Sequence, residues 1–249
     1  MPRKAREKSE SGIYHVMLRG INKQQIFLDD EDFEKFLWVL HDVKEVSEYK
    51  LLAYCLMGNH IHLLLKVGKE PIEQIFRRIG TKFVYWYNIK YQRVGHLFQG
   101  RFKSEPIDDE SYLFTVIRYI HQNPVKANIC DNVGDYRYSS YREYVERNWI
   151  VDKDFVLQMM PIREFIRFNN SYNDDKCLDF DDKVIKRLTD KQAIDIIEMY
   201  SGCRTPNEFV YLAEKEQAKC LEKLKDEGLS IRQASRLTGV NISVVRKYF

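Results

Sequence analysis

The chain has 249 residues, 44% of them hydrophobic and 13% aromatic, enough to bury one substantial core and to leave material for a second, smaller module. No apolar run approaches the ~20 residues that span a bilayer, and the charged N-terminus is not followed by the apolar core of a signal peptide, so we expect a cytoplasmic protein with no membrane partner. The five cysteines are widely spaced without a C-x-x-C pair, which argues against a disulfide framework or a thiolate zinc site, and the net charge of +3 is too small to indicate a nucleic-acid partner by itself.

The chain begins with a pattern of short strands and one amphipathic helix. The predicted elements are, in order, a strand at 13–18, a helix from a cap at Asp29 or Asp30 to about residue 48, and strands at 51–56 and 61–67. Gly58 and Asn59 separate the last two strands and have the conformational freedom that a hairpin turn requires.

A second helix, a strand and a third helix follow. The helix runs from about Pro71 to Tyr91, the strand lies near residues 97–107, and the third helix begins at Asp108 or Asp109 and should stop at Pro124. The complete order is β-α-β-β-α-β-α. It predicts an α+β fold with a ferredoxin-like antiparallel sheet and helices on one face.

Residues 66–103 are the basic part of the chain, with nine Lys and Arg residues and only two acidic ones. Eight aromatic residues are interleaved with them, a mixture typical of proteins that neutralise phosphates and stack the bases of a single strand. An amphipathic helix with a solvated basic face would give the same pattern. The candidate DNA-binding residues of this stretch are Arg77, Arg78, Lys82, Lys90, Arg93, Arg101 and Lys103.

The composition changes after about residue 151, where charged helices and an acidic, Asn/Asp-rich stretch at 169–182 replace the alternating pattern. We interpret this stretch as a linker. The expected organisation is a domain at 1–150, a linker and helical extension at 151–185, and a helical DNA-binding region at 186–249.

The end of the chain, about residues 229–249, has the pattern of a helix-turn-helix. Ser230 and Asn241 can cap two short helices that Gly239 separates. An ordinary helical hairpin is the alternative. Four basic residues favour contact with duplex DNA: Arg232, Arg236, Arg246 and Lys247.

His60 and His62 are two residues apart at the start of a predicted strand, so both side chains point to one face. Two imidazoles on one face can chelate a metal ion, although two ordinary surface or partly buried histidines have the same spacing. Dense apolar residues on either side indicate a central strand, where a polar ring needs a partner. The pair is therefore a candidate metal site.

Tyr119 and Asn123 are four residues apart on the third predicted helix, so they stack on one side of it. Tyr119 lies at the edge of the apolar stripe, where it is a candidate nucleophile or one of 16 tyrosines that pack on the core with the hydroxyl in water. His121 is about 200° around the helix from Tyr119 and should not share its site. The histidines that we expect to be structural or to contact substrate are His15, His41, His96 and His121.

Several motifs, in this order along the chain, resemble one known family. They are Gly12-Ile13-Tyr14-His15-Val16 with Arg19-Gly20, Ile26-Phe27 with Asp29-Asp30, Tyr54-Cys55-Leu56-Met57-Gly58-Asn59-His60-Ile61-His62, Leu97-Phe98-Gln99-Gly100-Arg101-Phe102, and Tyr119-Ile120-His121-Gln122-Asn123-Pro124-Val125-Lys126. Over roughly residues 10 to 145 they resemble the HUH single-tyrosine transposases, and the REP-associated tyrosine transposases in particular. The resemblance implies an HUH nuclease fold for residues 1–150.

The resemblance also implies roles for individual residues. His60 and His62 match two metal ligands of the family, Tyr119 matches its nucleophile, and Asn123 matches a third ligand that is glutamine in the insertion-sequence relatives. Mg²⁺ or Mn²⁺ is the expected cofactor, because a divalent cation with nitrogen and oxygen ligands polarises the scissile phosphate. Attack by Tyr119 would leave a 5′-phosphotyrosine and a free 3′-OH, and a second 3′-OH could be joined without ATP.

The sequence thus predicts a metal-dependent single-stranded DNA endonuclease and strand transferase, a transposase that acts on hairpin or palindromic repeat DNA as a monomer or homodimer. A replication initiator or relaxase would use the same chemistry, but the chain is short and has no helicase-like region. A non-catalytic DNA-binding regulator would keep the fold and the helix-turn-helix without the reaction.

Overall fold

The computed structural model describes residues 6–146, 148–179 and 188–249. The chain divides into two compact units, Met1–Asp179 and Phe180–Phe249. None of the helices in the described ranges is long and apolar enough to cross a membrane.

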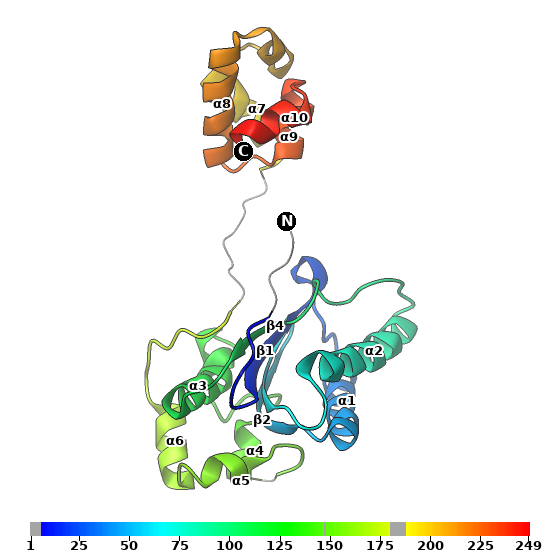
Figure 1. Ribbon diagram of the computed structural model, residues 1–249, viewed down its shortest axis with the longest axis vertical. Coiled ribbons are helices and arrows are strands. Elements are labelled where there is room, and N and C mark those ends of the chain that lie inside the picture. The colour runs from blue at the N-terminus through cyan, green and yellow to red at the C-terminus, as the bar shows by residue number, and fades with distance from the viewer. Residues whose placement is uncertain (1–5, 147, 180–187) are drawn as a thin grey trace. The chain divides into compact units, whose positions relative to one another are not determined.

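A four-stranded antiparallel sheet forms the centre of the first unit (Figure 1). Its strands are β1 (Ile13–Arg19), β2 (Lys50–Met57), β3 (His60–Lys66) and β4 (Lys103–Pro106), arranged in the order β2-β3-β1-β4. Gly58 and Asn59 connect β2 to β3, which confirms the predicted hairpin. β4 is shorter than the predicted strand at 97–107, because Gly100 has a φ of 69° and so leaves the extended conformation.

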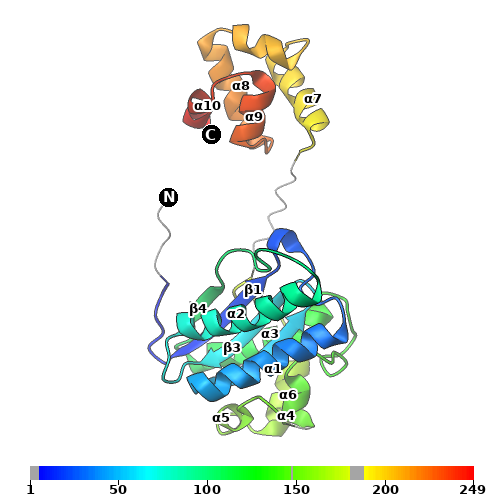
Figure 2. The same ribbon diagram turned by 90° about the vertical axis from the view of Figure 1, so that its right-hand side faces the viewer.

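Helices α1 (Asp30–Ser47) and α2 (Ile72–Lys90) cover one face of the sheet (Figure 2). Asp29 caps α1, because its side chain accepts a hydrogen bond from the backbone of Asp32. Phe36 of α1 and Phe83 of α2 meet edge to face with their ring centroids 5.0 Å apart, and both are fully buried. A short 3₁₀ helix, η1 (Ile21–Lys23), follows β1.

Helix α3 (Glu110–Lys126) lies over the opposite face of the sheet, as Figures 1 and 2 together show. The predicted α+β class with an antiparallel sheet is confirmed, but helices cover both faces rather than one. Every residue from Ile61 to Leu65 of β3 is buried, so the side chains of both faces need a covering layer. The prediction that Pro124 stops this helix is wrong, because α3 continues to Lys126 and the proline removes only the hydrogen bond to the Ile120 carbonyl.

Three more helices extend the first unit: α4 (Tyr141–Val145), α5 (Lys153–Leu157) and α6 (Ile162–Asn170). The described part of the stretch that we interpreted as a linker, up to residue 179, contacts α3. There Arg118 donates two hydrogen bonds, of 2.7 and 3.0 Å, to the carboxylate of Asp175. Asp175 and Asp179 of this segment therefore contact α3, whereas Asp174 is exposed. Residues 180–182 of the interpreted linker lie outside the described residues.

The second unit is helical and has a core of its own. Its elements are α7 (Asp190–Ser201), η2 (Pro206–Tyr211), α8 (Glu214–Asp226), α9 (Ile231–Thr238) and α10 (Ile242–Tyr248). Ser230 and Asn241 cap α9 and α10 with side-chain hydrogen bonds, as predicted. Gly239 between them adopts a φ of 73°, a conformation that favours glycine.

Candidate active site

His60 and His62 lie at the start of β3, on the face of the sheet that α3 covers. Their ring centroids are 5.1 Å apart. His60 is half-buried, and its Nδ1 lies 2.7 Å from the side-chain oxygen of Asn59. Because that oxygen accepts, Nδ1 of His60 carries the proton and the lone pair is on Nε2.

His62 is fully buried, and its two ring nitrogens have different surroundings. Nδ1 lies 3.1 Å from Nε2 of His15, whereas Nε2 has no hydrogen-bond partner. Burial, followed by the proximity of His15 and His60, lowers the pKa of His62 well below its usual value, so the ring is neutral. A neutral imidazole with an unpaired buried nitrogen has the properties of a metal ligand.

Tyr119 extends from α3 to the histidine pair, with its ring centroid 5.7 Å from that of His62. It is 7% exposed, and its hydroxyl donates a 2.7 Å hydrogen bond to Asp179. Burial, and then the Asp179 carboxylate, raise the pKa of the Tyr119 hydroxyl, while the side chain of Asn123 acts in the opposite direction. The hydroxyl is therefore un-ionised at neutral pH in this arrangement.

Asn123 follows Tyr119 by about one turn of α3. Its Nδ2 donates a 3.0 Å hydrogen bond to the Tyr119 carbonyl, so the amide oxygen is the atom with ligand character. In the part of the chain that the structure describes, no three His, Cys, Asp or Glu side chains form a metal-binding group. A metal site here would combine two imidazoles with an amide oxygen, and the orphaned Nε2 of His62 fits such a site.

The structure separates the predicted DNA-binding residues into two groups, and three on α2 are engaged within the protein. Their ion pairs are Arg78 with Glu70, Lys82 with Asp42, and Lys90 with Asp29, Glu31 and Asp32. Arg93 contacts the Gln24 side chain. These ion pairs join residues that are far apart in the chain, which the linear pattern could not show. The DNA-binding role of Arg78, Lys82 and Lys90 stays a prediction.

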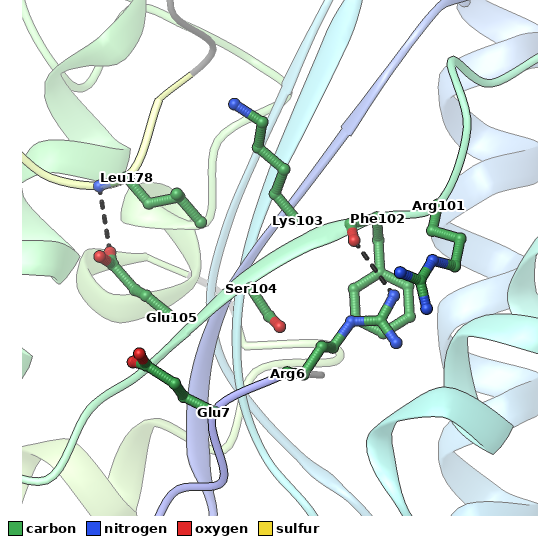
Figure 3. A pocket seen from close by; sticks show the side chains of 8 residues that line it. All are labelled: Arg6, Glu7, Arg101, Phe102, Lys103, Ser104, Glu105 and Leu178. Atoms are coloured by element: carbon green, nitrogen blue, oxygen red, sulfur yellow. Dashed lines mark hydrogen bonds between the residues drawn. The ribbon is translucent and has the colours of Figure 1, made fainter. Parts of the chain in front are cut away.

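The second group lines a groove along β4 (Figure 3). Arg6, Arg101, Phe102 and Lys103 border a cavity of about 610 Å³. A second cavity of about 350 Å³, which Arg77 also borders, shares Arg6, Arg101 and Phe102 with the first. The Arg6 guanidinium lies 3.7 Å from the Phe102 ring centroid, so it stacks on this ring.

The four basic residues of the predicted helix-turn-helix also differ in their contacts. Arg236 forms an ion pair with Asp190, with 2.6 Å between nitrogen and oxygen. Arg232, Arg246 and Lys247 have exposed side chains.

Residues 8–123 match the family model described as "Transposase IS200 like". The match covers somewhat less than half of the chain and shows a resemblance of residues 8–123 to this family. The chain is 24% identical over 153 residues to a Haemophilus influenzae protein described as a REP-associated tyrosine transposase, which covers 57% of this chain and 86% of that protein. The family is generally metal-dependent.

One solved structure has the same fold. It is a REP-associated tyrosine transposase bound to a REP hairpin, with a TM-score of 0.52 and 19% identity, over 61% of this chain and 93% of that chain.

The linear sequence does not show that three further residues lie at this site: His15, Glu105 and Asp179. The strand register places His15 beside Glu105 of β4 and diagonally next to His62 of β3. Period-two alternation in β1 could have shown that His15 shares a face with Met17, but only the pairing of three strands brings these groups together.

Proposed function

We propose that this chain is a tyrosine transposase, a metal-dependent single-stranded DNA endonuclease and strand transferase in which Tyr119 is the nucleophile and His60, His62 and Asn123 hold Mg²⁺ or Mn²⁺. The observation that carries the proposal is the Tyr119 ring packed beside a buried histidine whose Nε2 has no hydrogen-bond partner. Two imidazoles and an amide oxygen leave coordination positions open for phosphate oxygens.

When bound, the cation would polarise the scissile phosphate and stabilise negative charge on the phosphoryl oxygens and the leaving 3′-oxygen. Tyr119 supplies the nucleophile. Its oxygen gives its proton to solvent and bonds to phosphorus while the bond from phosphorus to the 3′-oxygen breaks. The leaving 3′-oxygen takes up a proton from solvent, which leaves a 5′-phosphotyrosine and a free 3′-OH. The ester retains the phosphoryl group in activated form, so another 3′-OH can attack it and join a new strand.

The groove along β4 is the path that we propose for the DNA strand. Arg77, Arg101 and Lys103 would neutralise phosphates along this path. Asp179 contacts the Tyr119 hydroxyl, so a phosphate that reaches this hydroxyl has to displace the carboxylate.

The proposed substrate is a single strand with hairpin or palindromic ends. The structural relative, which is bound to a REP hairpin, supports the hairpin part of this proposal. We assign the reaction to residues 1–150, a helical extension to 151–185 and duplex contact to 186–249, through Arg232, Arg246 and Lys247 on α9 and α10. The five cysteines are free thiols, which fits the cytoplasmic location that we propose. We propose that the protein acts as a monomer or homodimer.

The test uses the full chain and labelled single-stranded hairpins from the DNA that flanks its gene, with Mn²⁺ or EDTA, on denaturing gels. We expect metal-dependent cleavage that Tyr119→Phe abolishes while hairpin binding is retained. Binding without cleavage by the wild type, over several flanking sequences and both metals, would contradict the proposal and favour the DNA-binding regulator.

A further inference from the structure

His15 is fully buried in β1 and links His62 to a carboxylate. Its Nε2 lies 3.1 Å from Nδ1 of His62, and its Nδ1 lies 2.8 Å from Oε1 of Glu105. The backbone N–H of Leu178 also donates to Glu105, at 3.1 Å, and holds this carboxylate at the border of the β4 groove (Figure 3). Glu105, His15 and His62 thus form one continuous chain of hydrogen bonds.

The carboxylate determines where every proton of this chain lies. Ionised Glu105 only accepts, so Nδ1 of His15 carries a proton and, in the neutral ring, Nε2 carries a lone pair. That lone pair accepts from Nδ1 of His62, so the His62 lone pair is on Nε2. Nε2 is the buried nitrogen that has no hydrogen-bond partner.

The opposite arrangement leaves a buried donor unsatisfied. If His15 donated to Nδ1 of His62, the proton of a neutral His62 would be on Nε2, where it meets no acceptor. A buried donor without a partner destabilises the folded chain. The chain of three residues therefore selects one tautomer of His62.

We infer that Glu105 and His15 are positioning residues that fix His62 in the tautomer and orientation with Nε2 ready to bind a divalent cation. The inference rests on the proposed metal site. Neither residue touches the cation; they act through His62, as outer-shell partners of histidine ligands generally do.

The first test needs no metal. Long-range ¹H–¹⁵N spectra of the metal-free, histidine-labelled full chain report which ring nitrogen of His62 carries the proton, and His62→Gln assigns the signal. We expect the proton on Nδ1. A proton on Nε2 would overturn the inference, whatever the enzyme does.

The second test is calorimetric titration of the full chain with Mn²⁺. His15→Leu, which removes the acceptor, should weaken Mn²⁺ binding about 10- to 100-fold, and His15→Gln, whose Oε1 can accept from His62, should recover much of the loss. His41→Leu is the control, because this histidine stacks on Trp149 away from the site. Thermal melting of each variant separates loss of binding from loss of the fold.

Two outcomes distinguish this inference from the proposed function. If His62→Ala binds Mn²⁺ as the wild type does, the proposed metal site is wrong. If His62→Ala abolishes binding while folded His15→Leu binds as the wild type does, the metal site stands and the positioning role of His15 and Glu105 is refuted.

Discussion

Two fully buried histidines, His62 on β3 and His121 on α3, have opposite hydrogen-bond patterns. Both ring nitrogens of His121 have partners at 2.8 Å, the side-chain oxygen of Asn169 and the hydroxyl of Ser140. His62 has one partner, His15, and an unpaired Nε2. Since a buried polar atom without a partner is costly, the pattern of His121 is that of a structural histidine, and the pattern of His62 fits the proposed ligand role.

The His121 network holds elements of the first unit together. Ser140 accepts a 2.8 Å hydrogen bond from the backbone of Tyr54 on β2, and Asn169 belongs to α6. His121 therefore connects α3 with the sheet and with the helical extension. The expectation that His121 does not share the site of Tyr119 agrees with these contacts.

The largest expected effect is that of removing His62. His62→Ala should lower metal-dependent cleavage of a hairpin by more than about 100-fold, beyond the loss typical of outer-shell partners. The measurement is the initial cleavage rate at saturating Mn²⁺. His96→Ala, which alters an exposed histidine, should cleave at the wild-type rate. Equal cleavage rates for His62→Ala and His96→Ala would contradict the proposed ligand role of His62.

The second prediction concerns His121 and the pH dependence of stability. Burial lowers the pKa of His121 from 6.5 to about 4 in the folded chain. Between these values the unfolded chain binds a proton that the folded chain does not, so the free energy of unfolding falls as pH decreases from 6.5 to 4, by on the order of 3 kcal/mol. The stabilisation that comes from the lowered pKa of His121 is complete above pH 6.5.

Urea denaturation of the wild type and of His121→Gln at a series of pH values measures this difference. The variant should lose less stability than the wild type over the same interval. Parallel curves would show that His121 does not titrate on unfolding.

The third prediction compares two basic residues that the linear sequence could not distinguish. Arg101→Ala should weaken binding of a single strand roughly 3- to 10-fold and reduce the slope of log affinity against log salt by about 1. Lys82→Ala should change neither quantity, because Lys82 is paired with Asp42 at 2.5 Å. Fluorescence anisotropy at several salt concentrations measures both, and equal effects would contradict the assignment of the groove.

The smallest effect is expected at Asp179. Its carboxylate raises the pKa of the Tyr119 hydroxyl, so Asp179→Asn should ease ionisation and increase the cleavage rate, on the order of threefold, with the ascending limb of the pH profile shifted to lower pH. Asp174→Asn, an exposed neighbour, is the control. A slower Asp179→Asn enzyme would instead identify the carboxylate as a group that assists Tyr119.

Much of the fold followed from local signals. Helical periodicity and acidic caps located α1 and α3, and Gly58 and Asn59 located the hairpin that presents His60 and His62. The position of α3 on the second face did not follow, because a strand buried on both faces has the same apolar sequence whichever helix covers it. The segment up to residue 179 was misinterpreted because its acidic residues look solvated until Arg118 is placed beside Asp175.

The site was only partly accessible from the sequence. The spacing of His60 and His62 predicted a shared face, and the resemblance pointed to Tyr119, which lies beside His62. His15 and Glu105 are 90 residues apart, and only the registers of β1 with β3 and β4 bring them into one chain of hydrogen bonds. Similarly, no local pattern separates Lys82, which is paired, from Arg101, which borders the groove.

The most direct test of Tyr119 as the metal-dependent nucleophile is to locate the covalent DNA adduct by mass spectrometry, after the full chain has reacted with a single-stranded hairpin. We expect a nucleotide attached to the peptide that contains Tyr119. This adduct should form with Mn²⁺ and be absent with EDTA or in His62→Ala. An adduct on another residue, or one that forms equally well with EDTA, would contradict it.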